Sequence, residues 1–127
     1  MAICVDTNIF IDFLQGHPPA KHFLSKLLDQ ANPVYFSAIT EAELLSGQSC
    51  KVTKTREAII SLLNSFTKVE VDNPIAQLSG YIRRTHHTDL ADAMIAATAL
   101  KMEATLYTRN QKDYTQIAHL HLESPYA

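Results

Sequence analysis

Residues Ala2-Ile3-Cys4-Val5-Asp6 form a short apolar run that ends in an acid. Such a run is typical of a buried strand, and an acid directly after it lies at the carboxyl end of that strand. Further apolar runs predict strands over residues 34–39, 68–71 and 104–107, and a weaker run predicts one over 119–122. We therefore expect a sheet of four to five short strands.

Helical patterns fill the segments between these runs. They cover residues 20–30, 53–66, 74–84 and 91–102, and the third begins with Pro74, a residue that suits the first turn of a helix. Strands that alternate with helices predict an α/β fold whose mainly parallel sheet is covered on both faces. Ligands of such sheets bind beyond the carboxyl ends of the strands.

Length and composition limit the classes of protein that remain. The 127 residues correspond to one domain, which we place over 1–127, and 46% apolar with 19% charged residues exclude a disordered chain. A formal net charge of −2 excludes a global basic field that would attract nucleic acid. Neither a membrane-length apolar run nor a secretory signal is evident, and Cys4 and Cys50 form no motif, so we expect a cytoplasmic protein without membrane contact.

Acids follow several of the predicted strands or begin the helices behind them. These acids are Asp6, Glu41, Glu43, Asp89, Asp92 and Asp113. The carboxyl ends of parallel strands meet at one edge of a sheet, so we expect several of the acids to converge there. Neighbouring carboxylates repel unless a cation balances them, and oxygen ligands without thiolates suit Mg²⁺ or Mn²⁺. Such an ion can activate water for phosphodiester cleavage.

Most of these acids also allow a purely structural interpretation. Thr40 and Glu43 have the spacing of a capping box, in which each side chain caps a backbone N–H at a helix start. Asp6 and Asp89 stand where N-caps stand, and Asp113 would fit the first turn of a short helix. These alternatives remain open from the sequence alone.

Asp92 is the acid that packing explains least well. Its helical neighbours three, four and seven residues later are Ile95, Ala96 and Ala99, which form the apolar face of the alanine-rich helix. A carboxylate at the head of a buried stripe needs a partner. Asp92 is therefore predicted to serve a functional site.

Four motifs in this order resemble the PIN domain family, and within it the VapC toxins of bacterial toxin–antitoxin pairs. The motifs are VDTNIFID (5–12), AELLSG (42–47), DAMIAATA (92–99) and TRN (108–110) followed by DY (113–114). Together they span almost the whole chain. The resemblance implies a metal-dependent endoribonuclease on a three-layer α/β/α sandwich.

The resemblance also implies roles for individual residues. Asp6 and Asp92 would hold Mg²⁺ or Mn²⁺, and Glu43 would complete the site directly or through water. The family's frequent Arg-Asp-Phe is altered here, so the fourth position falls to Asp113 or to the neutral Asn110. Groups that would orient the carboxylates are Thr7, Asn8, Thr108 and Asn110.

The implied reaction is attack on an RNA phosphorus by water that a metal ion activates, with 5′-phosphate and 3′-hydroxyl products. The side chains that could contact RNA phosphates are Arg83, Arg84, Arg109 and Lys112. A cognate antitoxin and a homodimer are further partners that the resemblance implies. The helical segments 20–30 and 53–66 are candidate surfaces for the antitoxin.

Two other functions compete with this interpretation. In a phosphoacceptor receiver domain, Asp72 would be the acceptor near the end of the third strand, although the first strand ends in one acid only and residues 119–125 lack the expected lysine. The second alternative is a catalytically inactive PIN-like binding module, which the neutral Asn110 keeps open. RNA cleavage that requires both a divalent metal and Asp92 would distinguish a nuclease from these two alternatives.

Overall fold

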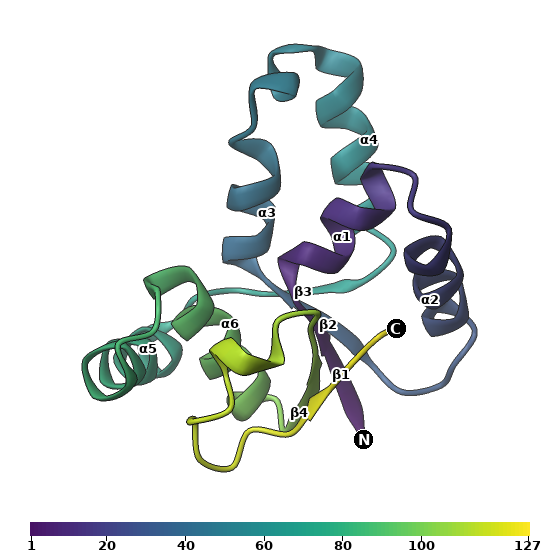
Figure 1. Ribbon diagram of the computed structural model, residues 1–127. Helices are drawn as coiled ribbons and strands as arrows, with labels where there is room; N and C mark the ends of the chain where they lie inside the picture. The colour runs from purple at the N-terminus through teal and green to yellow at the C-terminus, as the bar shows by residue number, and fades with distance from the viewer.

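Five parallel strands form a single sheet in the order β3-β2-β1-β4-β5. The structure is a computed structural model that describes residues 1–127, shown in Figure 1. The strands are β1 (Ala2–Val5), β2 (Val34–Ser37), β3 (Thr67–Val69), β4 (Ala104–Tyr107) and β5 (Leu122–Glu123). The parallel α/β architecture predicted from the sequence is confirmed, with β1 at the centre.

Six α-helices connect the strands. They are α1 (Thr7–Leu14), α2 (Pro18–Leu28), α3 (Ala38–Leu45), α4 (Thr53–Leu63), α5 (Asn73–His86) and α6 (Leu90–Lys101), with 3₁₀ turns at Gln48–Lys51 and Gln111–Asp113. Figure 1 shows α3 and α4 rising from the sheet as a paired arm, with α1 beside its base. None of these helices is long and apolar enough to cross a membrane.

The structure differs from the sequence-based elements in one missed helix and in several bounds; strand β3, for example, is Thr67–Val69 rather than 68–71. Helix α1 was not predicted, and β2 ends at Ser37 because Ile39 already belongs to α3, whose first turn Ser37 caps by accepting the Ile39 N–H at 3.2 Å. The last strand is Leu122–Glu123 rather than 119–122, since His119 adopts a left-handed backbone (φ 66°) that interrupts an extended run.

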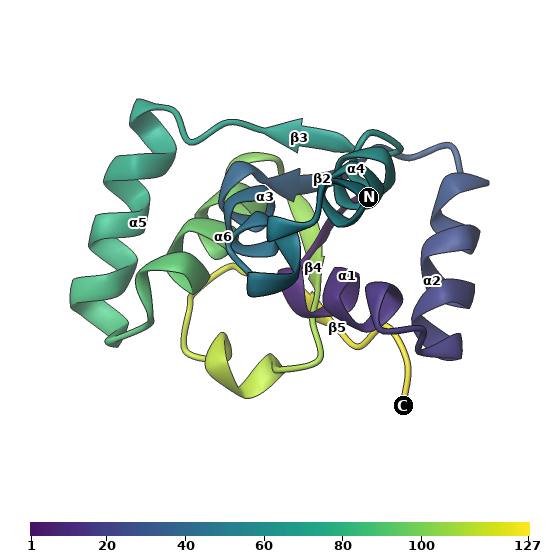
Figure 2. The same cartoon turned by 90° about the horizontal axis from the view of Figure 1, so that it is seen from above.

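Alternating strand residues divide the interior into two cores, one on each face of the sheet. Ile3 and Val5 of β1 face the core under α1, α2 and α4, whereas Cys4 faces the core under α5 and α6. Figure 2 shows α5 and α6 on one side of the sheet and α1 and α2 on the other. The two-residue period of a strand thus produces the α/β/α sandwich that the resemblance implied.

The third strand decides against a receiver domain. Strand β3 lies at the edge of the sheet, two strands away from β1. Asp72 behind it caps α5 by accepting the Ile75 N–H at 3.0 Å and pairs with Lys101 on the surface. These contacts hold the pKa of Asp72 below its usual value, with the Lys101 hydrogen bond as the main cause. Asp72 is therefore a helix cap remote from Asp6, and the receiver alternative is wrong.

Strand order also determines where a ligand can bind. From β1 the chain first builds β2 and β3 on one side, and later builds β4 and β5 on the other. The gap at the carboxyl ends of β1 and β4 is thus the point at which the order of strands reverses. Asp6 directly follows β1, and Thr108 directly follows β4.

Candidate active site

Asp6 is buried at the carboxyl end of β1 and is 5% exposed. Its backbone N–H donates to the carbonyl of Tyr107 at 3.0 Å, which continues the pairing of β1 with β4. Its Oδ2 accepts a hydrogen bond from the Thr108 hydroxyl at 2.7 Å. The parallel register of the two strands therefore places the Asp6 carboxylate beside the residue that follows β4.

Thr108 is held in place by two further groups. The Asn110 N–H donates to its hydroxyl oxygen at 3.0 Å, and the Asn8 side-chain amide donates at 3.4 Å. With both donors on its oxygen, the Thr108 hydroxyl is left to donate to Asp6. Asn110 contributes its backbone, whereas its side chain is exposed and makes no hydrogen bond.

Asp92 meets Asp6 through a tyrosine that the sequence did not single out. The Tyr114 hydroxyl lies 3.0 Å from Asp6 Oδ2 and 3.1 Å from Asp92 Oδ1. Asp92 stands in the first turn of α6, and Tyr114 ends the 3₁₀ turn behind β4. Two acids that are 86 positions apart thus share one hydroxyl. The available signal was the pair DY (113–114), which belongs to the fourth motif of the resemblance.

Glu43 is held by a separate network on the other side of Asp6. The Thr7 hydroxyl donates to Glu43 Oε1 at 2.7 Å, and Thr7 and Thr40 share a hydrogen bond of 2.8 Å. Because Thr7 donates to Glu43, Thr40 must be the donor in that second bond. The capping-box alternative is therefore wrong: Ser37 is the N-cap of α3, and Thr40 and Glu43 bond to Thr7 instead of to the helix start.

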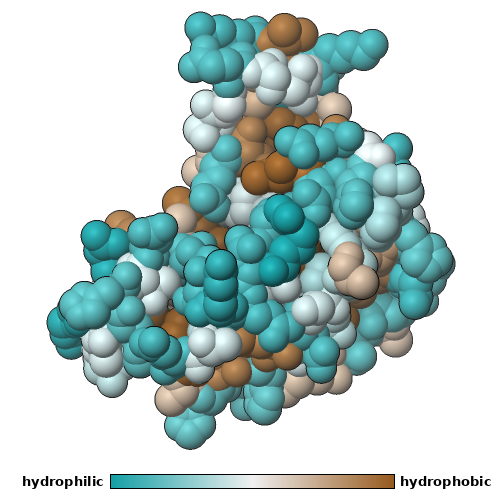
Figure 3. Space-filling model, viewed as in Figure 1, coloured by the Kyte–Doolittle hydropathy of each residue, from teal (hydrophilic) through white to brown (hydrophobic).

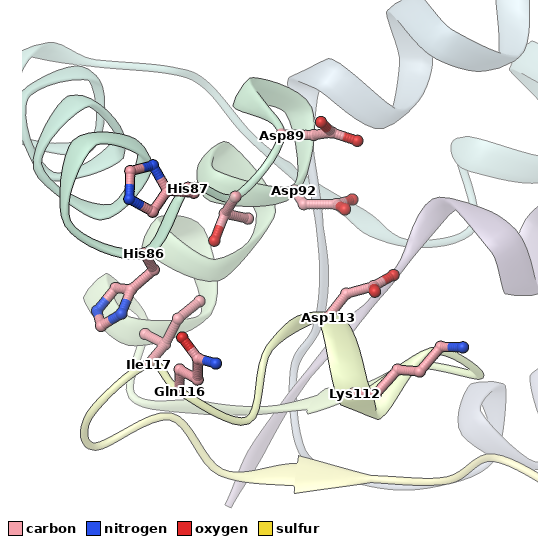
Figure 4. A pocket seen from close by; sticks show the side chains of 9 residues that line it. His86, His87, Asp89, Asp92, Lys112, Asp113, Gln116 and Ile117 are labelled. Carbon is pink, nitrogen blue, oxygen red and sulfur yellow. The ribbon is translucent and has the colours of Figure 1, made fainter.

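Asp113 and Asp89 border the same hollow as Asp92. The hollow is lined by His86, His87, Thr88, Asp89, Asp92, Lys112, Asp113, Gln116 and Ile117. Figure 4 shows the carboxylates of Asp89, Asp92 and Asp113 pointing to one side, with the two histidine rings on the opposite side near the end of α5. Asp89 occupies the N-cap position of α6 but makes no side-chain cap bond.

Burial, with a smaller contribution from neighbouring charges, raises the pKa of Asp6 and Asp92. Burial is the main cause for Asp92, whose pKa rises to about 6, and the negative charges of Asp6, Asp113 and Asp89 add to the rise. Burial also raises the pKa of Asp6, although its hydrogen bonds from Thr108 and Tyr114 oppose the shift. Strongly shifted carboxyls in a cleft are typical of functional sites.

The donor set suits a hard divalent cation that keeps most of its water. No three His, Cys, Asp or Glu side chains lie close enough together to bind one ion. Asp6 and Asp92 converge on a single point, and no basic side chain pairs with either of them. Mg²⁺ is commonly bound by one or two carboxylates together with water and substrate phosphate. The buried Asn8 Oδ1 also has no partner in the chain.

Three of the four predicted RNA-contacting residues lie near the acids. Lys112 lines the hollow of Asp92, and Arg83 and Arg84 line an adjoining hollow with His87 and Asp89. Arg109 instead pairs with Asp12 at 2.8 Å and borders a different hollow beside the C-terminal residues. The structure therefore does not bring Arg109 to the same surface.

Comparisons with known proteins agree with this architecture. A family model described as PIN domain matches residues 3–120. Ribonuclease VapC2 of Rickettsia felis is 31% identical over 134 residues, which cover 98% of this chain and 98% of that protein. Ribonuclease VapC19 of Mycobacterium tuberculosis is 29% identical over 131 residues, which cover 96% of this chain and 98% of that protein.

A solved structure gives the same result in three dimensions. A chain of a toxin–antitoxin complex from Klebsiella pneumoniae superposes with a TM-score of 0.81 at 30% identity, and the match covers 98% of both chains. The similarity therefore includes the acid-bearing edge as well as the sheet.

Proposed function

Since this chain belongs to the PIN domain family and has VapC ribonucleases among its relatives, we propose that it is a metal-dependent endoribonuclease and the toxin of a toxin–antitoxin pair. One observation supports this most strongly. Asp6 and Asp92 meet at the Tyr114 hydroxyl at the strand-order reversal of the sheet, where parallel sheets bind their ligands.

Asp6 and Asp92 are the residues that would hold Mg²⁺ or Mn²⁺. The ion supplies activation of water and neutralisation of the phosphate charge. Glu43 stands on the other side of Asp6 with one oxygen bonded to Thr7, so it is positioned to orient water rather than to bind the ion directly. Asp113, which borders the hollow of Asp92, is a better candidate for the fourth position than Asn110, whose side chain makes no contact there.

The RNA strand would lie along the rim where α5 ends. Lys112, Arg83 and Arg84 border the two adjoining hollows, and cations there would bind backbone phosphates without reading sequence. The Arg84 guanidinium also lies over the exposed Tyr81 ring, 5.4 Å from its centroid, in a cation–π contact on the surface of α5. Replacement of Arg84 by alanine should weaken RNA binding at low salt more than replacement of Arg109.

The partner that restrains the toxin would be a cognate antitoxin. An apolar groove runs between α1 and the α3–α4 arm, lined by Ile11, Leu14, Glu43, Leu44, Val52 and Ile59 among others. Figure 3 shows apolar side chains gathered at the base of this arm. Because Glu43 belongs to the lining, a segment seated in the groove would reach the acidic site. A homodimer, which sedimentation analysis would detect, also remains part of the proposal.

Cleavage of a labelled transfer-RNA pool by antitoxin-free protein tests the proposal. We expect cutting with Mg²⁺ or Mn²⁺, and loss of cutting with EDTA or in Asp92→Asn by at least about a hundredfold. Lys101→Gln, a charge change at the far end of the same helix, serves as the matched control. The products should carry 5′-phosphate and 3′-hydroxyl ends.

Three outcomes would count against the proposal. Cutting that survives EDTA or Asp92→Asn would place the activity elsewhere. A cyclic phosphate product would mean that the RNA's own 2′-hydroxyl is the nucleophile. A folded, metal-binding protein that neither cuts RNA nor arrests growth would instead be an inactive binding module.

A further inference from the structure

The Tyr114 hydroxyl is placed where it can control the two acids of the site. The tyrosine is 1% exposed, and its ring packs in the core beneath α5 and α6. Its hydroxyl emerges from that core between Asp6 Oδ2 and Asp92 Oδ1, at 3.0 and 3.1 Å. A phenylalanine would fill the same core volume, so packing alone does not account for the hydroxyl.

The hydrogen bonds distinguish between the two oxygens of each carboxylate. Asp6 Oδ2 accepts from the Thr108 hydroxyl and lies within hydrogen-bond distance of the Tyr114 hydroxyl, whose single proton it shares with Asp92, whereas Asp6 Oδ1 accepts from no side chain. Asp92 Oδ1 is the oxygen that faces Tyr114, and Asp92 Oδ2 has no side-chain donor. Asp6 also accepts a hydrogen bond from the Thr7 backbone N–H, so its carboxylate is held by several donors, whereas Asp92 has Tyr114 as its single hydrogen-bond partner and keeps Oδ2 for a ligand.

On the basis of the proposed metal-dependent function, we propose that Tyr114 is a positioning residue for the divalent ion. Its hydroxyl can donate its proton to Asp6 Oδ2 or to Asp92 Oδ1, which keeps both oxygens beside it and would leave Asp92 Oδ2 for the metal. Tyr114 itself does not bind the ion. It acts by fixing the rotation of two carboxylates that would otherwise repel and turn independently.

Removal of the hydroxyl should therefore weaken the metal site without disturbing the fold. Partners that orient metal ligands typically contribute about 10- to 100-fold to metal affinity. We expect Tyr114→Phe to bind Mn²⁺ at least about tenfold more weakly than the unmodified protein, as measured by calorimetry or by electron paramagnetic resonance of free Mn²⁺. A high Mn²⁺ concentration should restore RNA cleavage by the same variant.

Tyr107→Phe is the matched control. The Tyr107 ring packs against Phe23 at 5.2 Å on the opposite face of the sheet, and its hydroxyl makes no hydrogen bond within the chain. The Mn²⁺ affinity of Tyr107→Phe should stay within about twofold of that of the unmodified protein. This change is much smaller than the tenfold loss of affinity, about 1.4 kcal/mol, that we expect for Tyr114→Phe. Mn²⁺ should also change the near-ultraviolet tyrosine spectrum of Tyr107→Phe and of the unmodified protein, but not that of Tyr114→Phe.

The outcomes separate this inference from the proposed function. If the unmodified protein binds Mn²⁺ and Tyr114→Phe binds it equally well, Tyr114 is only a packing residue and the inference is overturned. If the unmodified protein binds no Mn²⁺, the metal-dependent function fails as well. If Tyr114→Phe loses its cooperative melting transition, the variant cannot test the inference, and the near-ultraviolet tyrosine spectrum of the unmodified protein is used instead. A spectrum that does not change on addition of Mn²⁺ overturns the inference.

Discussion

Asp92 is a half-buried acid whose surroundings oppose its charge. Burial and the neighbouring carboxylates raise its pKa to about 6, whereas Asp in an unfolded chain has a pKa of about 3.9. Between these two values the folded protein binds more protons than the unfolded chain does. The free energy of unfolding of the metal-free protein should therefore fall as the pH rises from about 4 to 6 and stay low above that.

Asp92→Asn should relieve this repulsion while it abolishes activity. The asparagine side chain can accept the Tyr114 proton through its oxygen or donate its N–H to the hydroxyl oxygen, so the variant keeps the contact and loses the charge. Solvent screens part of the repulsion at this half-buried position, and we expect a gain of about 1 kcal/mol at pH 7, or roughly 3–5 °C in melting temperature. Thermal melting of Asp92→Asn and of the unmodified protein, in EDTA at pH 4.5 and at pH 7, measures this gain in stability.

The gain should be smaller at pH 4.5 than at pH 7, because the native carboxyl is already protonated there. Asp29→Asn, on the surface beyond α2 and away from the acids, provides the control and should shift neither value. A variant that is less stable than the unmodified protein at pH 7 would contradict the assignment of repulsion to this cluster.

Helix α6 carries the acid to the sheet, and its alanines set how closely it approaches. The side chains of Ala93, Ala96, Ala97 and Ala99 are fully buried against the core under α5 and α6. The apolar face predicted over Ile95, Ala96 and Ala99 is thus confirmed as buried. The close approach also brings Asp92, in the first turn of the helix, within reach of the Tyr114 hydroxyl.

Ala96→Leu should overfill this contact. Extra methylene groups in a well-packed core destabilise by about 1–3 kcal/mol, and displacement of α6 would also move Asp92 away from Asp6. Denaturant unfolding should therefore show a lower midpoint, and Mn²⁺ binding should weaken in the same variant. Ala76→Leu, on the exposed face of α5, should change stability by no more than about 0.5 kcal/mol. Equal effects of both substitutions would argue against close packing as the cause.

The whole molecule presents two surfaces of different character. One is the acidic edge, where the strands end, and the other is the apolar groove under the α3–α4 arm. Ile11 and Leu14 of α1 are each 39% exposed and line the groove. A monomeric surface rarely leaves such apolar groups gathered in a concave site without a partner.

Ile11→Asp combined with Leu14→Asp should separate inhibition from catalysis. The charges would oppose an apolar antitoxin segment, so inhibition by the cognate antitoxin should weaken at least about tenfold while RNA cleavage without antitoxin persists. Val71→Asp, a change of the same kind at an exposed position between β3 and α5 and outside the groove, is the control. Undiminished inhibition of the double variant would mean that the antitoxin binds another face.

Much of the architecture could be predicted from the sequence because its signals are local. Short apolar runs predicted β1 and β4 with the correct first and last residues. Such runs arise because a strand buried on both faces of a parallel sheet has few polar positions. The short edge strand β5 was misplaced, because a two-residue strand carries almost no pattern. Helix α1 was missed, because Ile9 and Phe10 are helical through their burial in the core rather than through helix propensity.

The candidate site was likewise predictable only in those features that depend on local sequence. The sequence by itself determined that acids would gather at the carboxyl ends of parallel strands. Strands that alternate with helices along the chain run parallel, and the acids directly follow these strands or begin the next helices. Only the tertiary structure decided which atoms meet. Thr40 and Glu43 fit a local capping box but bond to Thr7, and Tyr114 looked like one tyrosine among five until the fold brought its hydroxyl to two acids. Such contacts depend on the register of β1 with β4 and on the depth of α6, which arise from packing between segments distant in the chain.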